Sequence, residues 1–374
     1  MSILFSQYHF PAPNGGIDLD NRLIVAPMCQ YSSIDGVAND WHLTHWTNLM
    51  NSGAGAFIIE ATAVTEEGRI TPYCLGIYND ATAIAIKDIL ARARLQSAPI
   101  KVGIQLAHAG RKSSSHTPWD GGALIPPNED MGWQTLAPSE VPHNPKEPAP
   151  ESIDAAGLLR IKQGFVDAAR RSHEAGFDFI EIHAAHGYLI HQFLSPLANK
   201  RTDEYGGSLE NRMRYPLEVL AAIREVYEGV LGVRISATDW AEGGWDLEQC
   251  LVFCEKLKAL NISYIHVSSG GVAHDQKIAI GPGYQVSFAK KVKELIGLPT
   301  IAVGLITEPQ QAETILQNQE ADCIALARAF LYQPRWGWQA AAVLDGQVFA
   351  AKQYWRCLPR EHQNVFKSIK IGQR

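Results

Sequence analysis

Eight short runs of apolar and β-branched residues are spread along the chain, and most of them are separated by stretches with a helical pattern. The runs cover residues 22–28, 54–64, 100–108, 176–185, 231–239, 262–271, 298–306 and 322–330. Each run is continuously apolar instead of alternating, which is typical of strands buried on both faces of a parallel sheet. One of the helical stretches, 157–176, ends at Gly176, a residue type suited to close a helix.

Eight strands that alternate with helices predict a (β/α)8 barrel, the TIM-barrel fold. A doubly wound open sheet is the alternative, but the first strand–helix turn lacks the Gly-x-Gly-x-x-Gly pattern of its dinucleotide-binding version. A length of 374 residues fits a single barrel, so we expect one domain over residues 1–374. The segment of about 110–150, rich in Pro, Gly and Trp, is predicted to form a cap after the third strand, and about 340–374 a C-terminal tail.

Composition and charge narrow the range of partners. The chain is 46% apolar and 19% charged, which is ordinary for a globular protein with a large core. Lys and Arg number 33 against 39 Asp and Glu, and no basic run is present, so a nucleic-acid partner is not expected. The N-terminal residues do not resemble a signal peptide, and no apolar run is long enough to span a bilayer. The six cysteines are scattered and do not form the dense pattern of a disulfide framework, so we expect a reduced, cytoplasmic protein.

Polar side chains gather where the predicted strands end, which is where barrels of this kind place their active sites. They suit a large polar heterocycle better than a hydrolytic centre, because hydrogen-bonding groups are many and carboxylates few. Gly304 and Arg328 follow the seventh and eighth strands, where barrels commonly bind phosphate. The strand ends carry residues 27–31, Glu60 to Thr62, Gln105 with His108, His183 with His186 and Tyr188, Arg234, residues 268–271, residues 303–305 and residues 327–328.

His183, His186 and Tyr188 could bind a metal, carry protons or hold a ligand. The His-x-x-His spacing alone decides little, because it occurs again at His42 and His45. A metal centre would need further His or Asp ligands at other strand ends. Those ends offer cysteine, glutamine, tyrosine and arginine instead, so we expect no metal.

Several motifs resemble the Old Yellow Enzyme family of FMN-dependent ene-reductases, over residues 3 to 340. They are APMCQYSSIDGVANDWHLTHW, EATAVTEEGRITP, GIQLAHAGRK, EIHAAHGYLIHQFLSPLANKRTDEYGGSLENR and AVGLIT. The likeness is to the bacterial branch called thermophilic-like, which includes the xenobiotic reductases. It implies a barrel with non-covalent FMN, NADPH or NADH as hydride source, and small-molecule activated alkenes as substrates. The C=C bond reduced would be conjugated to a carbonyl or nitro group.

The resemblance also implies a role for each matching residue. His183 and His186 would donate hydrogen bonds to the substrate's oxygen, Tyr188 would deliver a proton to the α-carbon, and Tyr31 would line the substrate side. The flavin would contact Pro27, Met28, Cys29, Ala61, Gln105, Arg234, Gly304, Ala327 and Arg328. Ala327 departs from the glycine of many relatives, but its N–H is still available to phosphate. Taken alone, Arg234 could be part of a structural ion pair and Cys29 a small buried hydrophobe.

Three other functions compete with the ene-reductase interpretation, and the C-terminal tail suggests an oligomer. The larger dienoyl-CoA reductases share this barrel but need a tight cysteine group after the eighth strand, where only Cys357 lies beyond Cys323. A metal-dependent hydrolase and a non-catalytic FMN-binding barrel are the alternatives from other classes. In the tail, aromatic and arginine side chains of the types enriched at interfaces predict a homodimer or homotetramer, against the alternative of a solvated or self-packed tail. These are Tyr354, Trp355, Arg356 and Phe366.

Overall fold

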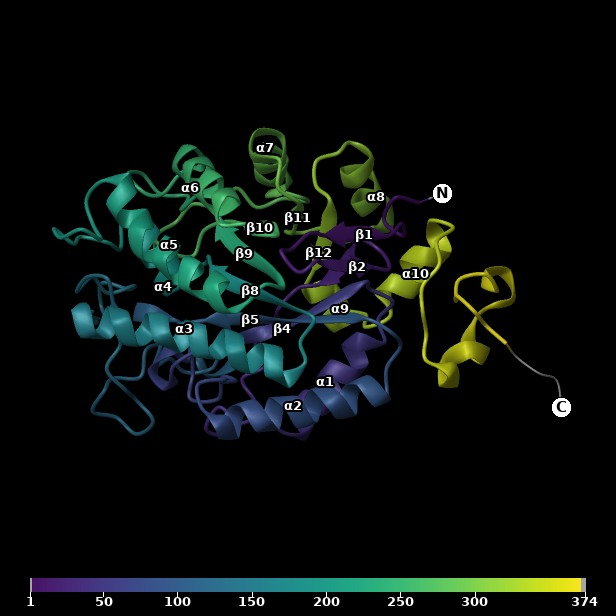
Figure 1. The fold of residues 1–374 in the computed structure, drawn as a ribbon, viewed down its shortest axis with the longest axis horizontal. Coiled ribbons are helices and arrows are strands. Elements are labelled where there is room, and N and C mark those ends of the chain that lie inside the picture. Colours follow the sequence, from purple (N-terminus) through teal and green to yellow (C-terminus); the bar gives the residue numbers. More distant parts are fainter. Residues whose placement is uncertain (1, 371–374) are drawn as a thin grey trace.

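The computed structural model describes residues 2–370, and within them eight parallel strands close into a barrel (Figure 1). The ring closes in the order β3, β4, β5, β8, β9, β10, β11, β12 and back to β3. Closure confirms the predicted (β/α)8 fold and excludes the open sheet. The barrel strands are β3 (Leu23–Val25), β4 (Ala56–Ala63), β5 (Lys101–Ala107), β8 (Phe179–Ala184), β9 (Val230–Ser236), β10 (Tyr264–Ser268), β11 (Thr300–Ala302) and β12 (Cys323–Leu326).

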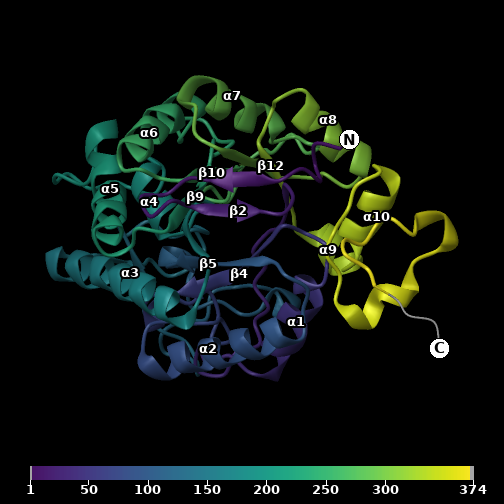
Figure 2. The ribbon, with the colours of Figure 1, turned by 45° about the vertical axis from the view of Figure 1, so that its right-hand side comes forward.

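Helices surround the barrel, as Figure 2 shows for α1 to α8. They are α1 (Asp40–Met50), α2 (Asp80–Leu95), α3 (Ala155–Ala175), α4 (Leu189–Leu194), α5 (Leu209–Val226), α6 (Leu247–Ala259), α7 (Val286–Ile296), α8 (Pro309–Gln317), α9 (Arg328–Tyr332) and α10 (Trp336–Val343). Side chains that accept a hydrogen bond from the first turn define several starts, as Asp154 does for α3. Helix α3 ends at the predicted Gly176, whose φ of +93° is the left-handed conformation that glycine adopts without strain.

An N-terminal hairpin closes the amino end of the barrel, and the apolar pattern did not predict it. Strands β1 (Tyr8–Phe10) and β2 (Ile17–Leu19) pair antiparallel, and Figure 2 shows the hairpin lying across the barrel. Phe10 is fully buried, with its ring centroid 4.7 Å from that of Tyr264 at the start of β10. Only the carboxyl end is therefore left to receive ligands.

The segment after β5 forms the expected cap. It contains the 3-10 turns η2 (Gly110–Lys112) and η3 (Pro118–Asp120) and a two-stranded sheet of β6 (Leu136–Ala137) and β7 (Glu151–Ser152). Arg111 ties the cap to the loop after β10, because its guanidinium donates to the carbonyl oxygens of Val141 and Val272 at 3.0 and 2.6 Å. The cap also places Trp119 edge-to-face on Tyr31, with ring centroids 5.7 Å apart.

The C-terminal tail follows α10 and runs along one side of the molecule (yellow in Figures 1 and 2). It includes the 3-10 turns η4 (Lys352–Cys357) and η5 (Arg360–His362). Phe366 is buried, with its ring centroid 4.8 Å from that of Trp338, and Lys367 pairs with Asp20 at 2.8 Å. The expectation that Phe366 anchors a subunit interface is wrong, because the aromatic ring packs within its own chain. Tyr354 and Arg356 are exposed.

Two further features of the described residues concern membranes and metal ions. In the described part of the chain, no helix combines the length and apolar character needed to cross a membrane. Within residues 2–370, no group of three or more His, Cys, Asp or Glu side chains is arranged to hold a metal ion.

A buried carboxyl group supports the backbone that enters the site after β3. Glu60, at an irregularity in the β4–β5 pairing, accepts the N–H of Gln30 at 2.9 Å. Its second oxygen lies 3.6 Å from Nε2 of His42 on α1, and neither side chain is exposed by more than 1%. Burial raises the pKa of Glu60 to about 8 and lowers the pKa of His42 to about 4. Both groups are therefore uncharged near neutral pH.

This pair makes a prediction about stability. The folded-state pKa of Glu60 lies above the unfolded value of 4.5, so its contribution is complete below pH 4.5 and is lost as pH rises through about 8. Relative to wild type, Glu60→Gln should therefore gain stability with rising pH, on the order of 1.4 kcal/mol per pH unit in that window. Denaturant unfolding at pH 5, 6.5 and 8 measures the trend. Glu66→Gln, at an exposed carboxylate, is the control, and a pH-independent difference for Glu60→Gln would contradict the assignment.

Candidate active site

The register of the barrel sets neighbouring polar residues side by side. Gln105 on β5 is paired with Glu181 on β8, and His183 is paired with Arg234 on β9. Arg234 is in turn paired with His266 on β10. Residues in register on adjacent strands lie at one height in the barrel. The strands therefore gather these side chains near their carboxyl ends, as the sequence predicted for Gln105, His183 and Arg234.

His183 and His186 face each other across the end of β8. Nε2 of His183 lies 3.3 Å from Nδ1 of His186, whose Nε2 lies 2.7 Å from Oγ of Ser268. Nδ1 of His183 accepts the N–H of Ala185 at 3.2 Å, which places the His183 proton on Nε2. Burial, reinforced by the charge of Arg234, lowers the pKa of both imidazoles well below the usual value. Both rings are therefore neutral at pH 7 and can donate a hydrogen bond.

Tyr188 lies beside this pair, at the start of α4. Its ring stands edge-to-face to His183, with the centroids 4.8 Å apart. Nζ of Lys112 lies 5.2 Å from the Tyr188 ring centroid. Burial, followed by nearby Cys29 and Tyr31, raises the pKa of Tyr188 well above its ordinary value. The phenol thus keeps its proton at neutral pH and can release it only to a strongly basic centre.

Cys29 and Tyr31 enter the same site from the segment after β3. Both side chains are half-buried, and the two groups lie close enough to change each other's pKa. Burial, with a smaller effect of Cys74, raises the pKa of the Cys29 thiol well above its usual range. The thiol is therefore protonated. Tyr31 has a φ of +49°, which directs this segment between the barrel and Trp119 of the cap.

Arg234 has the character of a residue that binds an anionic group. It is 8% exposed, its guanidinium makes no hydrogen bond within residues 2–370, and its Nε is buried without a partner. Burial lowers its pKa, an effect that the charge of Glu181 opposes. An unpartnered buried donor is costly unless a bound acceptor completes it. A negatively charged heterocycle above Arg234 would supply that acceptor.

Glu181, which the sequence analysis did not single out, organises the floor of the site. Its Oε1 accepts Nε2 of Gln105 at 2.7 Å, and its Oε2 lies 2.9 Å from Nδ1 of His266. Although burial alone would raise the pKa of Glu181, His266 and Arg234 hold it below the usual value. Because the Gln105 amide nitrogen is bound to Glu181, its oxygen remains free to accept a hydrogen bond from a ligand. A carboxylate inside an apolar strand was the signal available in the sequence.

The predicted phosphate residues follow β11 and β12, which are neighbours in the barrel. Gly304 has a φ of +121°, and a Cβ there would lie 2.6 Å from Nε2 of Gln285, so the position requires glycine. Ala327 precedes α9 and is half-buried, while Arg328 is exposed. Ala61 is in register with Gln105, and Pro27 and Met28 are half-buried beyond β3.

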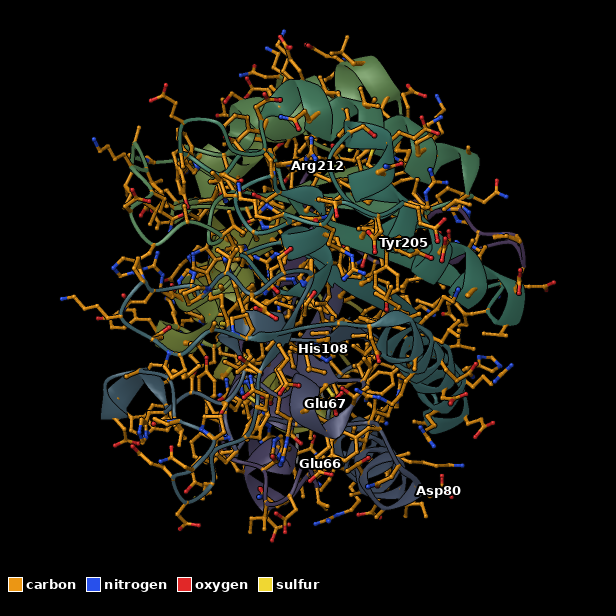
Figure 3. The ribbon with its side chains drawn as sticks, turned by 90° about the vertical axis from the view of Figure 1, so that its left-hand side faces the viewer. Glu66, Glu67, Asp80, His108, Tyr205 and Arg212 are labelled. Carbon is orange, nitrogen blue, oxygen red and sulfur yellow. The ribbon has the colours of Figure 1, made fainter. Side chains whose placement is uncertain are left out.

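His108 does not join the group. It lies one residue beyond β5 and turns towards the loop after β4, where its Nε2 is 3.8 Å from Glu67. Figure 3 shows Glu67 between His108 and Glu66. Burial would raise the pKa of Glu67, but contacts with His108 and Arg160 hold it well below the usual value. His108 thus supports the loop and is not among the side chains that face Tyr188.

Comparison with known proteins identifies the family. Residues 11–346 match the model of the NADH:flavin oxidoreductase / NADH oxidase family. The chain is 42% identical to an NADPH dehydrogenase of Listeria innocua, over 95% of this chain and 99% of the relative. It is 41% identical to an NADPH dehydrogenase of Geobacillus thermodenitrificans, over 95% and 98%. A morphinone reductase variant in complex with tetrahydroNAD superposes with a TM-score of 0.69 at 26% identity, covering 88% of this chain and 87% of that one.

These matches agree with the site. The orphaned donor of Arg234 and the free oxygen of Gln105 fit a flavin, and the relatives' names supply the nicotinamide co-substrate. The chain is therefore a member of the NADH:flavin oxidoreductase / NADH oxidase family, the Old Yellow Enzyme family, and an FMN-dependent NAD(P)H oxidoreductase.

Proposed function

We propose that the protein is an ene-reductase, which reduces the C=C bond of small alkenes conjugated to a carbonyl or nitro group. The observation that carries the proposal is the pair of facing nitrogens, Nε2 of His183 and Nδ1 of His186, with Tyr188 beside them. An oxygen atom seated at these nitrogens could receive a hydrogen bond from each. Ser268 supports either His186 tautomer, because its hydroxyl can donate or accept.

The proposed chemistry uses a cofactor, a donor pair and a proton donor. When bound, FMN would supply the hydride chemistry that links NADPH to the β-carbon of the alkene. Negative charge then develops on the substrate oxygen, and two fixed, neutral donors stabilise it without ionising. Tyr188 delivers its proton to the α-carbon, which is basic enough at that moment to take it from a phenol of raised pKa. One hydride and one proton are thereby added across the double bond.

The residues proposed to hold FMN divide into three sets. Arg234 would face the N1 and O2 edge, and Gln105 would accept from the pyrimidine ring through its free oxygen. The segment of Pro27, Met28 and Cys29 would lie against the ring together with Ala61. Gly304, Ala327 and Arg328 would bind the phosphate through backbone N–H groups and a positive charge. NADPH is favoured as the hydride source because both sequence relatives are named NADPH dehydrogenases.

An anaerobic experiment tests the function directly. The flavin is first reduced with NADPH or NADH, and its reoxidation by enones, maleimides and nitroalkenes is then followed by absorbance. Reoxidation with formation of the saturated product supports the proposal. A flavin that no alkene reoxidises would leave the alternative of a barrel that binds FMN without acting on alkenes.

The donor pair makes the first prediction of this function. His183→Ala and His186→Ala should each slow alkene reduction by about 10²–10³-fold, equivalent to roughly 2.7–4 kcal/mol, because one preorganised donor is lost. FMN content should not change. Stopped-flow reoxidation by cyclohexenone measures the effect, with His116→Ala in the exposed part of the cap as control. Parent rates in both site variants would remove the pair from the mechanism.

The proposed position of Arg234 beside the flavin predicts an effect on the reduction potential of bound FMN. Arg234→Met should lower the reduction potential of bound FMN, since the reduced flavin loses the positive charge beside its anionic edge. The shift corresponds to on the order of 30 mV for each 1.4 kcal/mol of lost stabilisation. Spectroelectrochemical titration of the loaded protein measures it, beside Arg170→Met on the solvent face of α3. An unchanged potential in the folded, FMN-loaded Arg234 variant would refute the assignment.

We further infer a homodimer or homotetramer, supported by exposed Tyr354 and Arg356 in a tail that stays on one side of the barrel. Deletion after residue 352 would also remove the buried ring of Phe366, so a point substitution is the sharper test. Arg356→Glu should weaken assembly, whereas the exposed control Lys256→Glu on α6 should not. Light scattering at micromolar concentration measures the oligomeric state of each protein, and a monomeric wild type would overturn the inference.

A further inference from the structure

The turn of His186 and Gly187 follows β8, and side chains bind the backbone N–H and carbonyl oxygen of both residues. His186 and Gly187 adopt φ angles of +56° and +74°, and a Cβ on Gly187 would lie 2.1 Å from the carbonyl oxygen of Gly271. A left-handed conformation in a non-glycine residue is unfavourable unless its surroundings enforce it. The His186 N–H donates to Oγ of Ser236 at 2.9 Å, and the His186 carbonyl oxygen accepts from Nζ of Lys112 at 2.9 Å. The Gly187 N–H donates to Nδ1 of His191 at 2.9 Å, and the Gly187 carbonyl oxygen accepts from Nε2 of Gln192 at 2.7 Å.

Among these partners, His191 can have only one tautomer. His191 Nδ1 accepts the Gly187 N–H, so the ring proton is on Nε2. Nε2 lies 2.9 Å from Oδ1 of Asp239, a close electrostatic contact whose angle is not that of a regular hydrogen bond, and neither atom has a hydrogen-bond partner within residues 2–370. Both side chains have no exposed surface. A carboxylate oxygen can only accept here, which fixes the proton of His191 on the nitrogen that faces it.

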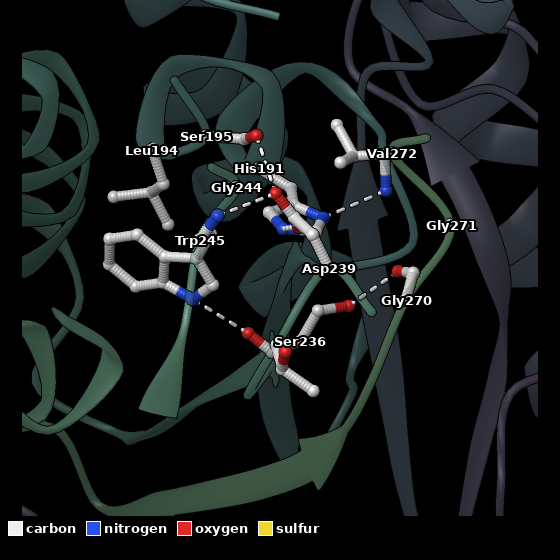
Figure 4. A network of polar contacts seen from close by, with 12 residues as sticks. His191, Leu194, Ser195, Ser236, Asp239, Gly244, Trp245, Gly270, Gly271 and Val272 are labelled. Atoms are coloured by element: carbon white, nitrogen blue, oxygen red, sulfur yellow. Dashed lines mark hydrogen bonds and ion pairs between the residues drawn. The ribbon is translucent and has the colours of Figure 1, made fainter. Parts of the chain in front are cut away.

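Asp239 is itself held in place. Its Oδ2 accepts the hydroxyl of Ser195 at 2.6 Å and the backbone N–H of Trp245 at 2.7 Å (Figure 4). The Trp245 indole donates to the carbonyl oxygen of Ser236 at 2.9 Å, and the Ser236 hydroxyl donates to Gly270 at the same distance. The network therefore returns to Ser236, which already binds the His186 N–H. The two ends of the turn are thus fixed by one connected set of buried groups.

We propose that Asp239, acting through His191, is a positioning residue for the donor pair and for Tyr188. It touches neither the substrate nor the flavin. It holds His191 in the tautomer that accepts the Gly187 N–H, and this bond sets the spacing between His186 and Tyr188 on either side of Gly187. The inference rests on the proposed function, since it assigns His186 and Tyr188 their roles.

Asp239→Asn tests the proposal without changing the shape of the side chain. The asparagine oxygen can still accept from Ser195 and Trp245, but its NH2 group then faces His191 Nε2. The His191 proton is expected to move to Nδ1, where it meets the N–H of Gly187 and two donors oppose each other. Ser195→Ala is the matched control, because Asp239 keeps the Trp245 N–H and the tautomer of His191 is unchanged.

Three measurements on the FMN-loaded protein give the outcome. Imidazole ¹⁵N NMR should show the His191 proton on Nε2 in wild type and Ser195→Ala, and on Nδ1 in Asp239→Asn. Flavin reoxidation by cyclohexenone should slow at least tenfold in Asp239→Asn and less than twofold in Ser195→Ala. The solvent deuterium isotope effect on reoxidation should rise only in Asp239→Asn, because proton delivery from a displaced Tyr188 then limits the rate.

Different results would refute the positioning role of Asp239 and the proposed ene-reductase function. A wild type that reduces no alkene refutes the proposed function, whereas the NMR result does not depend on it. If Asp239→Asn does not fold, the wild type still tests the proposal, because a His191 proton found on Nδ1 by ¹⁵N NMR would contradict the tautomer that Asp239 is proposed to hold. A wild-type rate and isotope effect in the folded variant would overturn the positioning role, as would a His191 proton that stays on Nε2.

Discussion

A cation enclosed by the barrel is the constraint on which the rest of the site depends. Arg234 lies on β9 of the closed barrel, is 8% exposed and has no hydrogen-bond partner within residues 2–370. An unpaired buried charge is tolerated only when neighbours compensate for its lost solvation. Glu181 provides part of this compensation, and a bound anionic flavin would provide the rest. The fold therefore holds the guanidinium of Arg234 at the carboxyl end of the barrel before any ligand binds.

Burial, reinforced by this charge, determines the protonation of the imidazoles beside it. Both rings are uncharged as a result, so His183 and His186 can donate hydrogen bonds and are not cations that would bind any anion tightly. Neutral donors gain most when charge appears on the substrate during reaction, which is the condition for stabilising a transition state more than the bound substrate. Glu60, uncharged behind the segment of Cys29, adds no negative charge that would oppose Arg234.

Much of the fold could be predicted from the sequence because strands buried on both faces leave a continuous apolar signal. The hairpin of β1 and β2 could not, since three-residue strands carry too little pattern. Individual side chains at the strand ends were predicted where a strand fixes their direction, as for Gln105 and Arg234. His108 lies beyond its strand, and its side chain approaches Glu67 in the loop after β4. Phe366 was misjudged because an aromatic ring in a charged tail looks the same whether it packs on its own chain or on another.

The hairpin that seals the amino end has a consequence for the order of events. With Phe10 and Leu19 fully buried under the strands, molecules reach the flavin only from the capped face. Under the proposed function, nicotinamide and alkene would occupy the same volume at different times, and each product would depart before the next reactant arrives. The alternation of the two proposed half-reactions would then follow from the shape of the barrel, and an excess of either reactant would obstruct the other.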